Sequence, residues 1–194
     1  MYKKLSDQAL IAQITDGAVG ILPTDTLYGL VCRAQVQTAV QRLYSIKKLT
    51  KPGTIIAASV EQLVELGLKA RYVKAVENFW PSALSVVLPC GPELAYLHLG
   101  SYSLAVRIPK HAELQNLLQA TGPLLTTSAN PTGQRPANTV TEAQKYFGQA
   151  VDFYVDGGNL SGQKPSTIIR IVDDAIEVLR EGAVTINENG RITS

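Results

Sequence analysis

The 194-residue sequence has few cysteines, no apolar run of membrane-spanning length and no recognisable secretion signal. Its two cysteines, Cys32 and Cys90, lie far apart and form no C-x-x-C motif, which argues against a disulfide framework and a cysteine zinc site. We interpret both as small apolar core residues. Because nothing in the sequence indicates a membrane span or a leader peptide, we expect a single domain over residues 1–194 in the cytoplasm.

Common catalytic and nucleotide-binding motifs are also missing. The sequence contains no G-x-x-x-x-G-K-[ST], no G-x-G-x-x-G and no G-x-S-x-G. Its two histidines, His98 and His111, have no metal-ligand spacing with each other or with the cysteines. These absences exclude the two common nucleotide fingerprints, argue against a Ser-His-Asp hydrolase and predict no metal ligands from the protein.

Acidic residues are absent from three windows of a chain whose formal net charge is only +2. That net charge does not favour wholesale nucleic-acid binding. The windows lie between residues 25 and 61, 93 and 113, and 156 and 173, and their basic residues are Arg33, Arg42, Lys47, Lys48, Lys51, Arg107, Lys110, Lys164 and Arg170. If the fold brings the windows together, they form a positive concavity suited to a phosphorylated ligand or to a local nucleic-acid patch. Chance and solvated surface are the alternative explanation.

The composition that remains, 45 % hydrophobic and 18 % charged, is typical of a globular domain. Apolar periodicity and capping signals predict helices over residues 6–14, 36–47, 59–67, a segment that ends near 80, 111–120 and 141–147. Strands are expected over 18–22, 54–58, 83–88, 103–108, 124–127, 151–155, 166–172 and 175–179, the last two forming a hairpin joined by residues 173 and 174. This alternation predicts one α/β domain with a twisted, mixed sheet flanked by helices.

Polar side chains follow two of the predicted strands. Thr24, Asp25 and Thr26 come directly after the first strand, where α/β folds tend to bind ligands, although an ordinary turn explains the same residues. Hydroxyl and amide side chains from Thr126 to Asn130 follow another strand and offer donors to phosphate or carboxylate oxygens.

Two basic residues are placed to face inward. Lys47 continues the apolar stripe of its helix, so it points toward the interior and can reach a phosphate; complementing the helix dipole is the alternative role. The two-residue period of a strand places Ser103 and Arg107 on one face, where they can grip an anion together.

Six segments in order resemble the YrdC-like family of threonylcarbamoyl-AMP synthases, and together they extend over residues 23–182. They are Pro23-Thr-Asp-Thr-Leu-Tyr-Gly-Leu30, the helix end at Lys47, Ser103-Leu-Ala-Val-Arg-Ile-Pro109, Thr127-Ser-Ala-Asn-Pro-Thr-Gly133, Asp156-Gly-Gly158 with Pro165-Ser-Thr-Ile-Ile169, and Leu179-Arg-Glu-Gly182. The resemblance implies a twisted sheet around a large, positively lined cavity. It also implies synthesis of threonylcarbamoyl-AMP and pyrophosphate from L-threonine, bicarbonate and ATP with Mg²⁺. Partner proteins then use the product to modify an adenosine beside the anticodon of tRNA.

The same resemblance implies roles for individual residues. L-Threonine would be held by Thr24, Arg107, Thr126 and Ser166, with Arg107 as the partner of its carboxylate. ATP would contact Lys47, Ser103, Ser128 and Arg180, with Asn130 supporting the same loop. Lys47 and Arg107 are the expected catalytic residues, because charge neutralisation and alignment of the reactants carry this chemistry.

One departure from the family pattern concerns the Lys-x-Arg motif. Leu49 stands where the family has its arginine, and the usual histidine after this loop is absent. Lys48 or Lys51 can compensate in charge, and we include Lys51 among the ATP contacts, but a lysine does not reproduce a bidentate guanidinium. Two alternatives therefore stay open: a related carbamoyl-transfer enzyme, and a nucleotide- or RNA-binding module without turnover.

Overall fold

The computed structural model describes residues 2–173, 175–187 and 191–193. Its helices are α1 (Gln8–Thr15), α2 (Gln37–Lys47), α3 (Val60–Leu66), α4 (Ala70–Ala75), α5 (Ala95–His98), α6 (Ala112–Thr121) and α7 (Val140–Phe147), with 3₁₀ turns at Glu77–Phe79 and Pro92–Leu94. Its strands are β1 (Gly20–Pro23), β2 (Tyr28–Arg33), β3 (Thr54–Ile56), β4 (Leu84–Pro89), β5 (Ser103–Arg107), β6 (Leu124–Ser128), β7 (Phe153–Tyr154), β8 (Thr167–Val172), β9 (Ala175–Arg180), β10 (Thr185–Ile186) and β11 (Ile192–Thr193).

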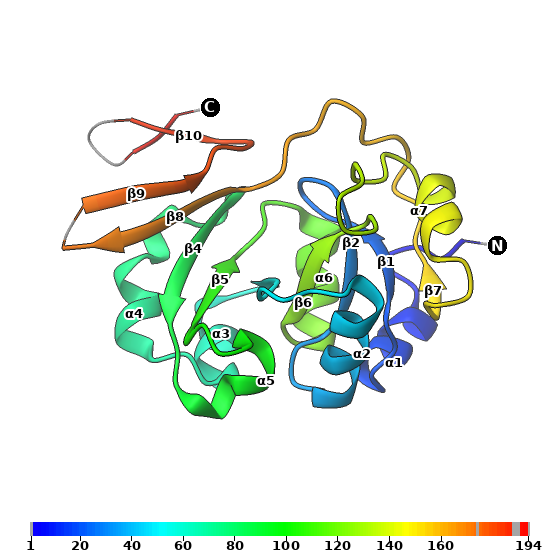
Figure 1. Cartoon of the computed structure of the whole chain (residues 1–194), viewed down its shortest axis with the longest axis horizontal. Coiled ribbons are helices and arrows are strands. Elements are labelled where there is room, and N and C mark those ends of the chain that lie inside the picture. Colours follow the sequence, from blue (N-terminus) through cyan, green and yellow to red (C-terminus); the bar gives the residue numbers. More distant parts are fainter. Residues whose placement is uncertain (1, 174, 188–190, 194) are drawn as a thin grey trace.

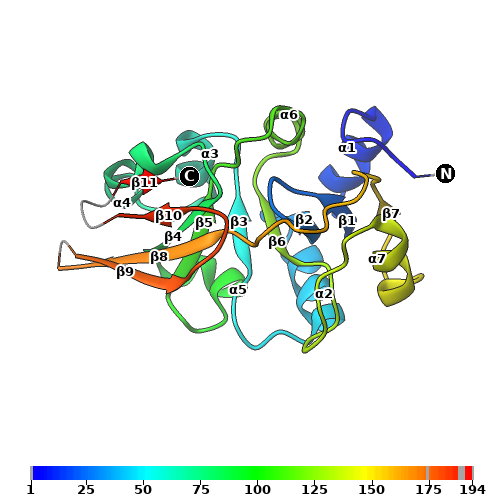
Figure 2. The same cartoon turned by 90° about the horizontal axis from the view of Figure 1, so that it is seen from above.

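One mixed sheet of nine strands, in the order β7-β1-β2-β6-β3-β5-β4-β8-β9, forms the centre of the fold. Figure 2 shows α1 and α6 on one side of this sheet and α2, α5 and α7 on the other. The sheet contains three parallel pairs (β1·β7, β3·β5, β4·β8) and antiparallel pairs elsewhere, which confirms the predicted α/β class and the mixed sheet.

Side chains that alternate along the strands divide into two buried clusters. Ile55 of β3 packs into the larger cluster with Leu125, Val106 and Val86, while its neighbour Ile56 packs with Leu124 and the leucines of α6. This alternation follows from the two-residue period of a strand, and it fixes the register. Both cysteines are free and buried, as predicted.

Several expected elements differ from the structure. The strand β2 was not predicted, because its burial on both faces gives Tyr28–Arg33 a continuous apolar run without alternation, directly after a turn signal. The short helix α5 and the β10–β11 pair were also missed. The helix expected to end near residue 80 is two pieces, α4 and the turn Glu77–Phe79, and the strand expected over 151–155 is only Phe153–Tyr154.

The expected hairpin is present as β8 and β9, although residue 174 of its connection lies outside the described residues. The capping signal behind the predicted helix over 59–67 is the capping-box pattern Ser59-x-x-Gln62, and the structure shows only part of that box. Ser59 accepts from the Gln62 amide, but the Gln62 side chain accepts from the backbone N–H of Ala58 rather than that of Ser59.

A long segment from residue 156 to residue 166, here called the strap, joins the two sides of the molecule. It leaves β7 at one edge of the sheet and reaches β8, next to the opposite edge (Figure 1). Near its start the Tyr28 hydroxyl accepts from the Gly157 amide and donates to the Gly158 carbonyl, both at 2.8 Å. A Cβ at Gly157 would lie 2.4 Å from the Pro23 ring, so this contact requires glycine. Within the described residues, none of the helices has the length and apolarity that crossing a bilayer requires.

Candidate active site

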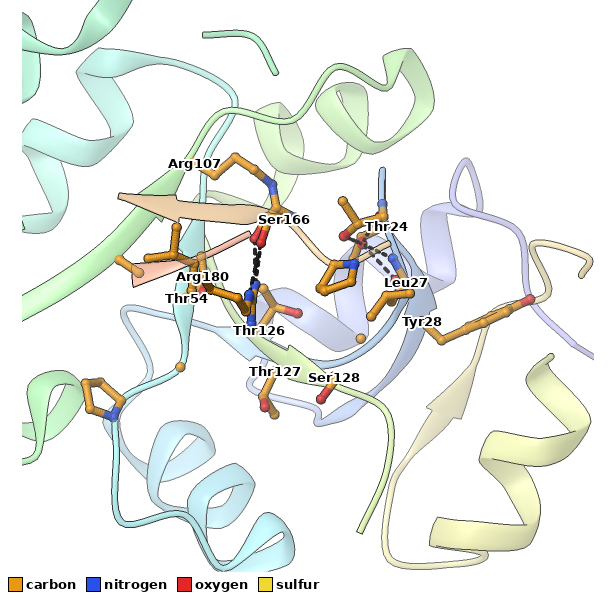
Figure 3. Close-up of a pocket in the computed structure, with 17 residues that line it drawn as sticks. Thr24, Leu27, Tyr28, Thr54, Arg107, Thr126, Thr127, Ser128, Ser166 and Arg180 are labelled. Atoms are coloured by element: carbon orange, nitrogen blue, oxygen red, sulfur yellow. Dashed lines mark hydrogen bonds between the residues drawn. The ribbon is translucent and has the colours of Figure 1, made fainter. Parts of the chain in front are cut away.

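A cavity of about 210 Å³ lies where the β1–β2 loop meets β3, β5, β6 and the start of the β8–β9 hairpin. Most of the residues that line it carry hydroxyl groups or are glycines or prolines (Figure 3). The residues that line it are Thr24, Thr26, Leu27, Tyr28, Gly29, Pro52, Gly53, Thr54, Ala105, Arg107, Thr126, Thr127, Ser128, Pro165, Ser166, Ile168 and Arg180. Of the described residues that line it, only Arg107 and Arg180 are charged. All three acid-free windows therefore contribute residues to one cavity. This meets the condition under which the sequence predicted a concavity suited to a phosphorylated ligand.

Strand register places the side chains of the cavity floor. Thr54 of β3 pairs with Thr126 of β6 on one side and with Ala105 of β5 on the other, so the three lie in one row. Arg107 lies two residues beyond Ala105 on the same strand face, as the strand period predicted. Glycines make room for this row, since a Cβ at Gly29 would lie 2.5 Å from the Thr126 hydroxyl.

The wall formed by residues 24–27 is a hydrogen-bonded turn. The Thr24 hydroxyl donates to the Leu27 carbonyl at 2.7 Å and accepts from the amides of Thr26 and Leu27 at 3.2 Å. This is the hydroxyl-stabilised turn that the sequence allowed as the simple explanation, and it also belongs to the cavity. The turn fixes the direction of Asp25 between the two threonines.

The two arginines meet across a small polar network. Arg107 donates to the Asp25 carboxylate at 2.8 Å and to the Ser85 hydroxyl at 3.2 Å, and the side chains of Arg107 and Asp25 are each 4 % exposed. Ser85 bonds Ser166 at 3.0 Å, and Arg180 donates to both the carbonyl and the hydroxyl of Ser166. Burial, followed by repulsion from Arg107, lowers the pKa of Arg180. Two guanidinium groups that close to each other favour an anion beside them.

Lys47 faces the interior, as predicted, but its ammonium group already has three close oxygen partners and a fourth, longer one. The residue is 5 % exposed, and Nζ donates to the carbonyls of Ser128 and Asn130, to the Asn130 side-chain oxygen at 2.8 Å and to the Ser128 hydroxyl at 3.5 Å. Burial lowers the pKa of Lys47 to about 8. Lys47 therefore holds the loop after β6 in place from behind the cavity, and it is not among the lining residues.

The predicted site residues thus fall into three groups. Thr24, Arg107, Thr126, Ser128, Ser166 and Arg180 line the cavity together. Lys47 and Asn130 lie directly behind Ser128. Lys51, which is exposed beside Pro52, and Ser103, two residues before Ala105 on the strand face, lie outside the lining. The positive charge of the cavity stays a prediction, because Asp25 offsets Arg107.

Sequence reasoning missed two residues of the site and left a third without a specific role. Ser85 and Thr54 were assigned to strands without a role, whereas Asp25 was singled out where α/β folds tend to bind ligands, but its pairing with Arg107 was not predicted. Asp25 had a usable signal, because it stands directly before the longest acid-free window and a buried arginine needs a counter-charge. Leu49, which replaces the family arginine, packs against the larger core cluster.

The fold and the site define an α/β domain whose mixed sheet carries a cavity lined by hydroxyl groups and two arginines. A family model described as "Telomere recombination", which covers the Sua5, YciO and YrdC proteins, matches residues 12–182. The threonylcarbamoyl-AMP synthase of Pseudoalteromonas translucida is 35 % identical over 179 residues, which cover 84 % of this chain and 94 % of that protein. The chain belongs to the Sua5/YciO/YrdC family.

Solved structures agree with this assignment. P. abyssi Sua5, complexed with L-threonine, is 28 % identical with a TM-score of 0.80, and the match covers 91 % of this chain and 54 % of that one. The chain therefore spans about half the length of the P. abyssi protein. E. coli YciO is 26 % identical with a TM-score of 0.77, and the match covers 90 % of this chain and 87 % of that one.

Proposed function

We propose that this chain is an L-threonylcarbamoyladenylate synthase, which makes threonylcarbamoyl-AMP and pyrophosphate from L-threonine, bicarbonate and ATP. One observation carries the proposal. Thr24, Arg107, Thr126 and Ser166, the four residues that the family resemblance assigns to L-threonine, come from four separate segments and line one cavity. Relatives that match this chain over most of its length and of their own are named threonylcarbamoyl-AMP synthase.

The proposed chemistry forms two bonds in sequence. The threonine nitrogen attacks the bicarbonate carbon, and water leaves to give the carbamate. A carbamate oxygen then attacks the α-phosphorus of ATP, and the bond to the β-phosphate oxygen breaks to release pyrophosphate. Arg107 would hold the threonine carboxylate, while Thr24 and Thr126 border the same part of the cavity. Such alignment can supply about 7–11 kcal/mol of the barrier.

The ATP side of the reaction falls to a second set of residues. Ser128 and Arg180 line the cavity, and Arg180 would neutralise charge on the transferring phosphate. Lys51 and Ser103 would extend these contacts at the rim, whereas Lys47 and Asn130 would act by shaping the loop that presents Ser128. Mg²⁺ would arrive as part of the MgATP substrate and be held by its phosphates, since the described residues that line the cavity include no carboxylate.

The product would be passed on to proteins that transfer the threonylcarbamoyl group to tRNA. A protein that serves tRNA modification would work in the cytoplasm. Direct contact with RNA would add to this transfer but is not required by the synthase reaction itself.

Pyrophosphate release tests the proposal. The full chain is incubated with MgATP and bicarbonate, with and without L-threonine, and we expect release that depends strictly on threonine. Release that instead depends on carbamoyl phosphate would favour the related carbamoyl-transfer reaction. No turnover even with partner proteins and tRNA, together with salt-sensitive RNA binding, would favour the binding module and identify Leu49 as the mark of a lost activity.

A further inference from the structure

The ion pair between Arg107, which lines the cavity, and Asp25, which lies behind it and borders a second, outer cavity, is deeply buried. Both side chains are 4 % exposed, and their contact of 2.8 Å uses one oxygen and one terminal nitrogen. In the part of the chain that the structure describes, Asp25 Oδ2 and Arg107 Nε are buried without a hydrogen-bond partner. The pair therefore makes only some of its possible hydrogen bonds. Because burying such a pair brings little or no net stability, its presence points to a functional role.

The charge of the cavity is consequently uneven. Arg107 brings its own counter-ion, so that end of the cavity is neutral as a whole. Among the described residues, Arg180 bonds to the carbonyl and hydroxyl oxygens of Ser166, which are uncharged, so its end lacks a counter-ion. Both arginines line one cavity of about 210 Å³.

We propose that Asp25 is a specificity-determining residue that makes the Arg107 end accept a zwitterionic amino acid and reject phosphate. This inference rests on the proposed function, in which an amino acid and a polyphosphate must occupy neighbouring parts of the cavity. A bare arginine attracts a phosphate dianion at least as strongly as a carboxylate. A carboxylate fixed beside that arginine repels the dianion. An amino acid loses less, because its ammonium group compensates for its own carboxylate.

The fold supports this role because it fixes Asp25 rigidly. The Thr24 hydroxyl closes the turn by accepting from the amides of Thr26 and Leu27, and the hydroxyls of Thr24 and Thr26 contact each other at 3.1 Å. A repulsive element built against the wrong ligand is a common way to gain specificity. Without Asp25, phosphate groups would compete with threonine for Arg107.

The test compares two ligands on one variant, Asp25→Asn. Calorimetry measures threonine binding to the full chain without ATP, with and without inorganic phosphate as the competing probe. We expect phosphate to compete at least about tenfold more strongly, because this effect reflects the loss of one buried charge, whereas the threonine dissociation constant without phosphate should change only about threefold or less. A merely structural residue would weaken both ligands together, so parallel weakening, or no change in either, would overturn the proposal.

Glu113→Gln is the matched control. Glu113 is an exposed carboxylate that lines the same outer cavity of about 560 Å³ that Asp25 borders, but it has no contact with Arg107. This variant removes the same charge, and both constants should stay within about twofold of wild type because exposed charges are screened.

Wild-type protein provides a readout that needs no variant. Even a large excess of inorganic phosphate should leave its threonine affinity unchanged. Displacement of threonine by phosphate would overturn the proposal. This measurement decides the question even if Asp25→Asn fails to fold. Threonine-dependent pyrophosphate release is measured separately. Its absence would defeat the proposed function, whereas the role of Asp25 is decided by the two binding constants alone.

Discussion

Arg107 is held by a counter-ion, which changes what its removal would do. Arg107→Ala should weaken threonine binding several-fold to a hundredfold, because charge-assisted hydrogen bonds contribute about 1.5–3 kcal/mol. It also leaves Asp25 buried without its partner, so the variant should lose about 3–5 kcal/mol of stability. Calorimetry checks the first effect and a melting curve the second. Unchanged threonine affinity in a folded variant would refute the assignment.

Lys47 acts on the loop after β6 rather than on the cavity surface. Lys47→Ala should lower ATP-dependent pyrophosphate release at least about tenfold, because three oxygens of Ser128 and Asn130 lose their donor. Lys48→Ala is the matched control, since Lys48 is exposed at the end of α2 and should matter little. Lys51→Ala should be as damaging as Lys47→Ala only if Lys51 has replaced the missing arginine. Full activity in all three variants would show that the triphosphate is held elsewhere.

The lowered pKa of Lys47 predicts a pH dependence. Its folded pKa of about 8 lies below the usual value of 10.5, so the ammonium loses its proton as pH rises through about 8. The neutral amine has two hydrogens for three acceptors, and the loop loosens. ATP affinity measured from acidic to alkaline pH should therefore fall through this range in wild type and stay flat in Lys47→Gln. An equal fall in both proteins would show that another group titrates.

At the scale of elements, the sequence predicted most helices and strands but not the arrangement that makes the site. Periodicity was sufficient for α2 and for the face of β5 that carries Arg107. It was insufficient for β2, which is buried on both sides, and for the pairing of Arg107 with Asp25, which depends on how the β1–β2 loop lies across β5. Contacts between residues so far apart in sequence leave no periodic pattern, so only the folded chain shows them.

Gly29 of β2 shows how closely the strands fit around the cavity. Gly29→Ala would place a Cβ 2.5 Å from the Thr126 hydroxyl and 3.3 Å from the Thr24 methyl group. We expect threonine affinity to fall at least about tenfold, since overpacking of this kind costs about 1–3 kcal/mol and displaces two binding residues. The control is Gly20→Ala in β1, whose Cβ would meet Phe153 at 2.4 Å, away from the cavity. Gly20→Ala should lower the melting temperature but leave affinity intact, and equal losses of affinity would contradict this explanation.

For the molecule as a whole, paired charges limit binding to nucleic acid. The net charge is +2, and Arg42, Arg107, Arg135 and Arg170 each form an ion pair with an acid. We therefore expect generic single-stranded RNA to bind only at low ionic strength. Fluorescence anisotropy at about 50 mM and about 200 mM salt measures this, and affinity should fall steeply between them. Tight binding at the higher salt would favour the RNA-binding alternative.

Because the strap separates two sets of cavity residues in the sequence, the cavity is completed late during synthesis of the chain. Thr24, Arg107 and Thr126 lie before the strap, whereas Ser166 is its last residue and Arg180 lies after it, on the hairpin that pairs with β4. A nascent chain emerges from its N-terminus, so it presents half of the cavity long before the other half exists. The hairpin forms by local pairing and then docks on a strand made much earlier. Competence to bind is thus acquired only after Arg180 has left the ribosome.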